Sequence, residues 1–133
     1  NLPIRNLTNG LFEDDFLSYI NEVLPLKTDE ALMEFECKLL DKVFRSKMVI
    51  EISRYGRVTL PATIRSIMRY LFTDNLLKDF SYKGQKKKQN FSLLAVNSVI
   101  FDAIKHMKRF QKFDTIEVED PIKIFLAGAK FRE

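Results

Sequence analysis

The sequence predicts an all-α fold, a compact single domain of about five to seven helices. Apolar residues recur at the three- and four-residue spacing of a helix in several separate stretches of the chain. Gly and Pro number only four each, which is too few for the many tight turns of a β-sandwich or barrel. The 133 residues are 46% hydrophobic, so the chain is long and apolar enough to bury one core.

The clearest helix is expected over residues 60–72. Pro61 suits the first turn of this helix, because the N–H that proline lacks has no partner there. Arg65 and Arg69 lie four residues apart and therefore share one face of the helix. Asp74 is then expected to cap a short second helix. The apolar stripe of the first helix contains Leu60, Ile64, Ile67, Met68, Leu71 and Phe72. Of these, Ile67, Met68, Leu71 and Phe72 are expected to form the centre of the core.

Residues 1–23 are expected to form an irregular arm followed by a helix. The apolar face of this helix contains Phe12, Phe16 and Ile20. Such a face must be buried, either on the same domain or on a partner such as a second copy of the chain. We therefore divide the chain into this N-terminal segment, a candidate interaction element, and a helical domain of residues 24–133.

Two more helices are expected before the central one. Thr28 is a good N-cap for a helix that runs to about Phe44. Its expected core stripe contains Leu32, Phe35, Leu39, Leu40 and Val43, and the residues at the margin of the stripe are Met33, Cys37 and Phe44. The cysteine is expected to be a small core residue. Residues 46–55 form a further helical stretch, and Gly56 is expected to close it as a left-handed cap.

The C-terminal third contains two further helical patterns. Asn97 or Ser98 is expected to cap the first of them. Residues 115–119 alternate between polar and apolar side chains, so a short strand is an alternative there. Asp120 followed by Pro121 predicts the start of the last helix, since proline is favoured in a first turn.

Charge is distributed unevenly along the chain, whose net charge is +4. Residues 42–112 carry 16 Lys/Arg against 4 Asp/Glu, a net charge of +12. Residues 1–41 carry 3 against 9, which gives −6, and residues 113–133 carry 3 against 5, which gives −2. This distribution predicts a basic surface between acidic ones and favours an anionic partner, unless folding mixes the charges.

The basic residues gather around a glycine-containing loop and the end of a later helix. The lysine run follows Gly84 in a loop that we expect to be exposed and mobile. Its lysines would contact phosphates without reading bases, whereas Arg65 or Arg69 could pair with guanine. The candidate nucleic-acid-binding residues are Arg65, Arg69, Lys83, Lys86, Lys87, Lys88, Lys105, Lys108 and Arg109.

No pattern in the sequence indicates catalysis. It contains no nucleophile–base pair, no phosphate-cradling glycine loop and no cluster of metal ligands, so no enzymatic activity, cofactor or metal is expected. His106, the only histidine, lies among lysines and is expected to be an exposed polar residue.

No apolar run reaches the roughly 20 residues that a membrane helix needs. The single cysteine cannot form an internal disulfide, which fits a reducing, intracellular compartment. The first residue is not Met, so we expect a piece of a longer protein.

Several stretches between Leu24 and Lys130 carry a resemblance to known families. They are LPLKTDEALMEFECKLL, IRSIMRYLFTDNLLKDFSYKGQKKKQNF, SVIFDAIK and the closing helix with Ala129-Lys130. Together they resemble a domain of unknown function found in insect and cnidarian proteins. The middle stretch is also similar to BEN domains, small all-helical modules of chromatin and transcription proteins. The residues that match the BEN pattern are Leu71-Phe72, Leu76-Leu77, Tyr82, Gly84 and Lys86–Lys88.

The resemblance implies an all-α, BEN-like fold, a nuclear location and DNA binding. BEN domains that read DNA rely heavily on their last helix. In this chain the corresponding region carries Glu117, Glu119 and Asp120, whose carboxylates would repel phosphate. This departure argues against sequence-specific reading of the major groove by the last helix.

Two functional hypotheses remain open from the sequence. In the first, the chain is a DNA-binding module of a nuclear protein involved in chromatin or transcription regulation, and it contacts mainly phosphates of duplex DNA. In the second, it is a protein-interaction or homodimerisation module of a chromatin-associated scaffold and does not bind DNA directly. Phe12, Phe16 and Ile20 would then contact the partner. The family resemblance alone does not separate these hypotheses.

Overall fold

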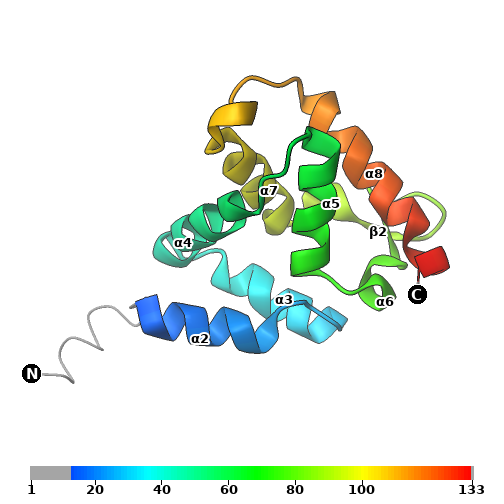
Figure 1. Cartoon of the computed structure of the whole chain (residues 1–133). Coiled ribbons are helices and arrows are strands. Elements are labelled where there is room, and N and C mark those ends of the chain that lie inside the picture. The colour runs from blue at the N-terminus through cyan, green and yellow to red at the C-terminus, as the bar shows by residue number, and fades with distance from the viewer. Residues whose placement is uncertain (1–12, 133) are drawn as a thin grey trace, which may run out of the picture.

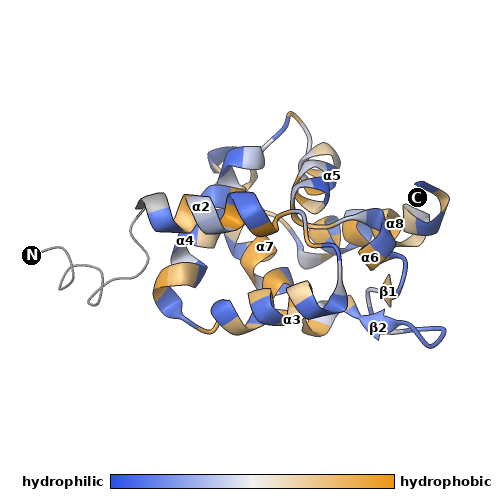
Figure 2. Cartoon of the chain, turned by 90° about the horizontal axis from the view of Figure 1, so that it is seen from below, coloured by the Kyte–Doolittle hydropathy of each residue, from blue (hydrophilic) through white to orange (hydrophobic). Residues whose placement is uncertain are grey.

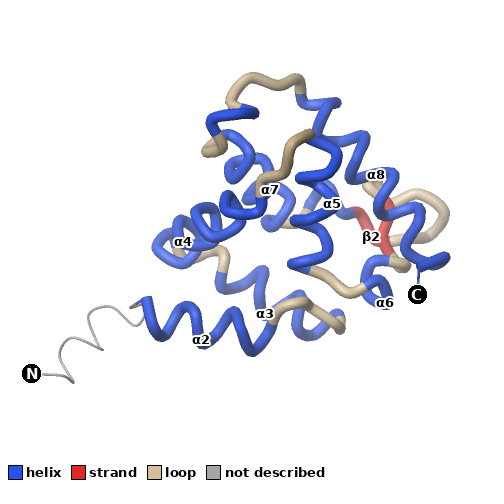
Figure 3. The backbone as a smooth tube through the Cα atoms, in the orientation of Figure 1, coloured by secondary structure: helices blue, strands red, loops and turns tan. Residues whose placement is uncertain are grey.

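The central element of the fold is α5 (Leu60–Leu71), with the other helices arranged around it (Figure 1). The structure is a computed structural model and describes residues 13–132. Within this range it contains seven α-helices, three 3₁₀ helices and two short strands, which confirms the all-α prediction (Figure 3). Besides α5, the elements in chain order are α2 (Glu13–Val23), α3 (Asp29–Lys38), α4 (Lys42–Ile52), η1 (Ser53–Tyr55), α6 (Asp74–Leu77), β1 (Phe80–Ser81), β2 (Gln89–Asn90), η2 (Phe91–Leu93), α7 (Ala95–Lys105), η3 (Lys108–Phe110) and α8 (Thr115–Arg132).

The start of α5 and the burial of its apolar stripe agree with the prediction. The Thr59 side chain accepts a hydrogen bond from the backbone N–H of Ala62 and so caps the helix, with Pro61 in the first turn. The arginines of α5 stay exposed while its apolar face is covered by neighbouring elements. The stripe residues with no exposed surface are Ile64, Ile67, Met68 and Leu71, and Phe72 beside them is also buried.

Helix α2 packs on the same core as the rest of the chain. Phe16 and Ile20 are each only 1% exposed. The ring of Phe16 meets that of Phe44 on α4 edge to face, with 5.5 Å between their centroids. Phe16 and Ile20 are therefore buried within their own domain and not on a partner. Phe12, the third residue of the predicted face, lies outside the described residues.

The single helix predicted from Thr28 to Phe44 is in fact two helices. The Thr28 cap is confirmed, but α3 ends at Lys38, and the carboxylate of Asp41 accepts from the N–H of Val43 to begin α4. This break changes which residues point inward. Cys37, predicted in the core, is exposed. Other apolar residues of the predicted stripe or its margin that are exposed are Met33, Leu40 and Val43.

The last helix begins earlier than the sequence indicated. α8 starts at Thr115, so residues 115–119 are helical and do not form the alternative strand. The first turn is stabilised by a reciprocal pair, in which the N–H of Asp114 donates to Glu117 Oε1 at 2.8 Å and the N–H of Glu117 donates to the Asp114 carbonyl at 2.9 Å. Pro121 therefore lies inside the helix and does not mark its first turn.

Three smaller predictions about helix ends are also wrong. Thr73, and not Asp74, caps α6, because its side-chain oxygen accepts from the N–H of Leu76. Gly56 follows η1 in an extended conformation with φ −64° and ψ 143°, so it is not a left-handed cap. The predicted cap positions Asn97 and Ser98 both lie inside α7, which begins at Ala95.

Helix α7 is capped by a residue from a distant part of the sequence. The carboxylate of Glu36 on α3 accepts from the N–H of Ala95 at 2.8 Å and from that of Val96 at 2.9 Å. One charged side chain thereby satisfies two of the N–H groups that a helix start leaves without partners. This interaction also fixes α3 against the start of α7.

We predict that Glu36→Ala destabilises the fold by about 1–3 kcal/mol, because two partly buried N–H groups lose their acceptor. Urea denaturation followed by circular dichroism measures the change. Glu34→Ala is the matched control, since Glu34 is an exposed carboxylate on the same helix. Its effect is expected to stay within about 0.5 kcal/mol. Equal effects of the two substitutions would show that the cap contributes nothing specific.

Candidate functional site

The candidate basic residues lie in separate places on the surface. One group is on the lysine loop, which we define as residues 82–88 between β1 and β2, and another is at η3. In Figure 1 this loop and η3 lie on opposite sides of α5. Arg65 and Arg69 face a groove between α5 and α8. The structure therefore does not join the nine candidates into one patch, and each group has its own surroundings.

The lysine loop is folded on itself. β1 and β2 pair in parallel, with Phe80 opposite Gln89 and Ser81 opposite Asn90. The Ser81 hydroxyl accepts from the N–H of Gln85 at 2.6 Å, and the N–H of Lys88 donates to the Gln85 carbonyl at 3.0 Å. The loop that the sequence predicted to be mobile is therefore held by hydrogen bonds. Figure 2 shows that it is hydrophilic and projects from the body of the domain.

Three residues of the loop have left-handed backbone conformations. Gly84 has φ 75°, where a residue without Cβ is unstrained. Lys86 and Lys87 follow with φ 56° and 65°. For residues other than glycine this conformation costs roughly 1–2 kcal/mol each. Two consecutive lysines in this conformation are unusual, and such strain is concentrated at functional positions.

The loop and α8 form the two sides of a pocket of about 420 Å³, which we call the lysine pocket. Lys86 and Lys88 line it from the loop and Lys123 lines it from α8. The Nζ atoms of Lys83 and Lys123 lie 5.5 and 5.8 Å from the centroid of the Tyr82 ring. None of the described residues that line the pocket is acidic. The sequence did not reveal Lys123 as a candidate, because only the packing of α8 brings it to the loop.

Tyr82 anchors the loop to both neighbouring helices. Its hydroxyl accepts from Nδ2 of Asn97 on α7 at 3.2 Å and donates to Oε2 of Glu119 on α8 at 3.5 Å. Burial raises the pKa of Tyr82, and Glu119 adds to the rise, while the Asn97 hydrogen bond lowers it. The hydroxyl therefore stays protonated at neutral pH and keeps its donor role.

A second basic pocket lies between η1 and η3. Arg54 and Arg57 line it together with the predicted residues Lys108 and Arg109. The guanidinium of Arg109 donates to the Arg57 carbonyl at 3.0 Å, which ties η3 to the segment before α5. Arg54 is paired with Glu51 at 3.2 Å, so part of this positive charge is compensated. Arg54 and Arg57 were missed because they are far from η3 in the sequence.

Lys105 lies in a more neutral environment than the other candidates. It lines a pocket between α4 and α7 that also contains Arg45, Asp102 and His106. Arg45 Nη2 is 2.8 Å from Asp102 Oδ2, so these two charges offset each other. His106 is exposed, as expected. Among the predicted phosphate ligands, Lys105 is therefore the one whose surroundings favour an anion least.

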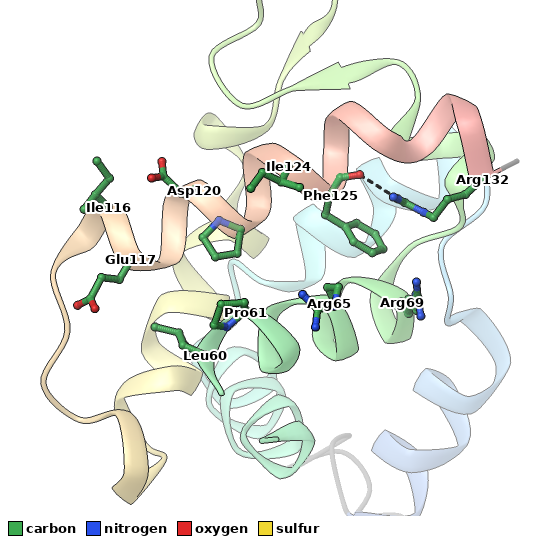
Figure 4. Close-up of a pocket in the computed structure, with 11 residues that line it drawn as sticks. Leu60, Pro61, Arg65, Arg69, Ile116, Glu117, Asp120, Ile124, Phe125 and Arg132 are labelled. Carbon is green, nitrogen blue, oxygen red and sulfur yellow. Dashed lines mark hydrogen bonds between the residues drawn. The ribbon is translucent and has the colours of Figure 1, made fainter. Parts of the chain in front are cut away.

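The α5–α8 groove differs from both basic pockets in being mostly apolar. It has a volume of about 500 Å³. Leu60 and Pro61 line it from α5, and Ile116, Ile124 and Phe125 line it from α8. In Figure 4 the Phe125 ring points toward α5, whereas Ile116 and Ile124 lie on the upper side of α8. Charged residues lie toward its two ends. Glu117 and Asp120 are at one end, and Arg65, Arg69 and Arg132 are toward the other (Figure 4).

Arg132 closes one end of this groove. Its Nε and Nη2 atoms both donate to Asp74 Oδ1, at 3.1 and 2.9 Å, and its guanidinium lies 3.8 Å from the centroid of the Phe125 ring. Gly128 leaves room for the Arg132 guanidinium, because a Cβ on residue 128 would lie 2.7 Å from Arg132 Nη1. The glycine that weakens α8 by propensity therefore leaves space for the guanidinium.

Comparison with family models gives one match. The model described as Domain of unknown function (DUF4806) covers residues 21–116, which is well over half of the chain. Comparison with curated proteins and with solved structures finds no match.

In the part of the chain that the structure describes, no group of three or more His, Cys, Asp or Glu could hold a metal ion. Within the same part, no helix has the length and apolar character needed to cross a membrane.

We predict that Tyr82→Phe destabilises the fold by about 1–3 kcal/mol, because the buried amide of Asn97 loses its acceptor. Chemical denaturation measures this loss. Tyr19→Phe is the control, since Tyr19 is half-buried and its hydroxyl has no hydrogen bond to a described residue. It is expected to change stability by less than about 0.5 kcal/mol. An unchanged stability of the Tyr82 variant would mean that the hydroxyl does not anchor the loop.

Proposed function

The chain belongs to the DUF4806 family, a domain of unknown function, and from its surface we propose that it binds DNA mainly through phosphate contacts of the lysine loop. The observation that carries this proposal is the lysine pocket. Lys86, Lys88 and Lys123 come from two elements and converge on one hollow with no acidic residue among its described lining. The three ammonium groups repel one another in the free protein. When a polyanion binds, its negative charges offset this repulsion and the interaction becomes favourable.

The backbone of the loop supports the same proposal. Lys86 and Lys87 adopt strained left-handed conformations, which the turn hydrogen bonds and the Tyr82 anchor maintain. The loop therefore presents its lysines from a defined position and does not need to be ordered on binding. A preformed site loses less conformational entropy when its ligand binds.

A polyanion fits this surface better than a single small anion. Residues 42–112 carry a net charge of +12, which attracts an extended charged polymer. The basic pocket formed by Arg57, Lys108 and Arg109 adds a second positive region on a different part of the domain. Multiple phosphate contacts of this kind give an affinity that falls steeply with salt.

The proposed binding is weakly selective for sequence. Lysine acts as a point charge on a flexible stem, and phosphate contacts carry no base information. Glu117 and Asp120 on the exposed start of α8 would oppose its insertion into a groove of DNA. Similarity of the middle stretch to BEN domains supports the proposed role, and the proposal extends to a nuclear, chromatin- or transcription-associated protein without catalytic activity.

The test compares two double variants that remove the same charge. Lys86→Gln/Lys87→Gln changes the loop, and Lys27→Gln/Lys42→Gln changes two exposed lysines elsewhere. Each protein is titrated with two unrelated DNA duplexes at several salt concentrations. The loop variant is expected to reduce the slope of log affinity against log salt by about 0.9 for each lost contact, equally on both duplexes. The control is expected to leave the slope unchanged.

Three results would contradict the proposal. Wild-type protein that fails to bind duplex DNA at low salt would remove the DNA-binding role. Equal losses in the loop variant and in the control would show that only net charge matters. A thousandfold preference for one duplex would show base reading and overturn the assignment of mainly phosphate contacts.

A further inference from the structure

The α5–α8 groove lies apart from the proposed DNA-binding surface. α8 separates the two: Lys123, Leu126 and Ala127 line the lysine pocket, whereas Ile124 and Pro121 line the groove. Two aliphatic residues of the groove are strongly exposed, Ile116 at 57% and Ile124 at 73%. With Leu60, Pro61 and Pro121 they make up an apolar part of the lining that the DNA-binding proposal does not use.

The charged residues of the groove indicate the chemistry of its ligand. Arg132 is already bound to Asp74. No carboxylate among the described residues pairs with Arg65 or Arg69, both of which are exposed on α5. The end of the groove near these two arginines therefore provides free guanidinium groups, which favour bidentate contacts with carboxylates.

The same groove is unfavourable for nucleic acid. Glu117 and Asp120 line it together with the arginines. Their carboxylates would repel phosphates that pass along the groove. Its aliphatic lining also offers no favourable contact to a phosphate backbone. Arg65 and Arg69, whose guanidinium groups could pair with guanine, therefore lie in surroundings that suit a protein ligand better.

We propose that this groove binds a short segment of a partner protein that carries aliphatic side chains next to acidic residues. The aliphatic side chains would contact Ile116, Ile124 and Pro61, and the carboxylates would pair with Arg65 and Arg69. A volume of about 500 Å³ lies within the range of roughly 300–1,000 Å³ that is typical of ligand pockets. The inference does not depend on the DNA-binding proposal, because it concerns the other flank of α8.

One wall of the groove is preformed. The Phe125 ring lies between the backbone of α8 and the guanidinium of Arg132, whose Nη2 also donates to the Phe125 carbonyl at 2.9 Å. The guanidinium of Arg69 lies 5.7 Å from the centroid of the same ring. The ring itself is only 4% exposed, so these contacts fix the positions of the two guanidinium groups and present arginine, a residue type enriched at binding hot spots, to a ligand.

The test is a selection of random 16-residue peptides displayed on phage, with the intact chain as target. Enriched peptides are expected to share aliphatic residues with nearby Asp or Glu. Binding of these peptides is then measured with Arg65→Glu/Arg69→Glu and with Ile124→Ser. Both variants are expected to lose at least about tenfold in affinity, which is the size of effect at a hot spot. Lys27→Gln/Lys42→Gln, which changes two exposed lysines outside the groove, is the control and is expected to bind as wild type does.

Charge reversal provides a second, positive readout. A selection on Arg65→Glu/Arg69→Glu is expected to enrich peptides with Lys or Arg in place of the acidic residues. Since both arginines are exposed, the variant should fold, and its circular dichroism spectrum and melting temperature verify this. Should it not fold, Arg65→Gln/Arg69→Gln replaces it and is expected to lose at least about tenfold in affinity for the acidic peptides.

Several outcomes would overturn the inference. A selection without enrichment, or peptides whose binding ignores the groove substitutions, would show that no such ligand is recognised there. A groove variant that weakens duplex binding as much as the loop variant would assign the groove to nucleic acid. A change in the solution mass of the protein with Ile124→Ser would assign it to a second copy of the chain.

Discussion

Burial of one apolar stripe of α8 is the constraint on which both surfaces depend. The stripe packs α8 against α5, α6 and β1, and each fully buried aliphatic or aromatic side chain contributes about 1.5–3 kcal/mol. Successive residues of a helix point about 100° apart. Fixing the stripe therefore directs Lys123 toward the lysine pocket and Ile124 toward the groove. The buried stripe residues are Val118, Ile122, Phe125, Leu126 and Ala129.

The two flanks of α8 have different chemistry although both contain basic residues. On one side, three lysines meet with no acidic residue among the described lining. On the other, arginines share an apolar groove with Glu117 and Asp120. The net charge of a segment therefore does not identify its ligand. A pocket lined by lysines without acidic residues favours a polyanion, whereas an apolar groove with charged residues of both signs favours a protein segment. The tertiary arrangement divides residues that the sequence placed in one basic set.

Some predictions that rest on local pattern agree with the structure. The buried stripe of α5 and the cap of α3 at Thr28 follow from helical spacing and local hydrogen bonding. Two errors arose where a second helix-start signal nearby in the sequence prevailed over the signal used for the prediction. Asp41 starts a new helix where a continuous stripe was expected, and the Asp114–Glu117 pair starts α8 ahead of the stronger signal at Pro121.

Features that join distant segments were not predictable from one sequence. The cap of α7 comes from Glu36, 59 residues before Ala95, and Lys123 meets the loop only through packing. For Phe16 and Ile20, periodicity showed a face that must be buried but not what covers it. The structure provides the missing information, since both side chains are in the core of the same chain.

Mapping the DNA-binding surface by nuclear magnetic resonance tests the central claim most directly. Backbone amide shifts of the isotopically labelled chain are followed while a DNA duplex is added. The largest changes are expected at residues 82–88 and Lys123, with smaller changes at η1 and η3, while Arg65 and Ile116 in the groove keep their shifts. Changes centred on the groove or on α2 and α3, or no changes at all, would contradict it.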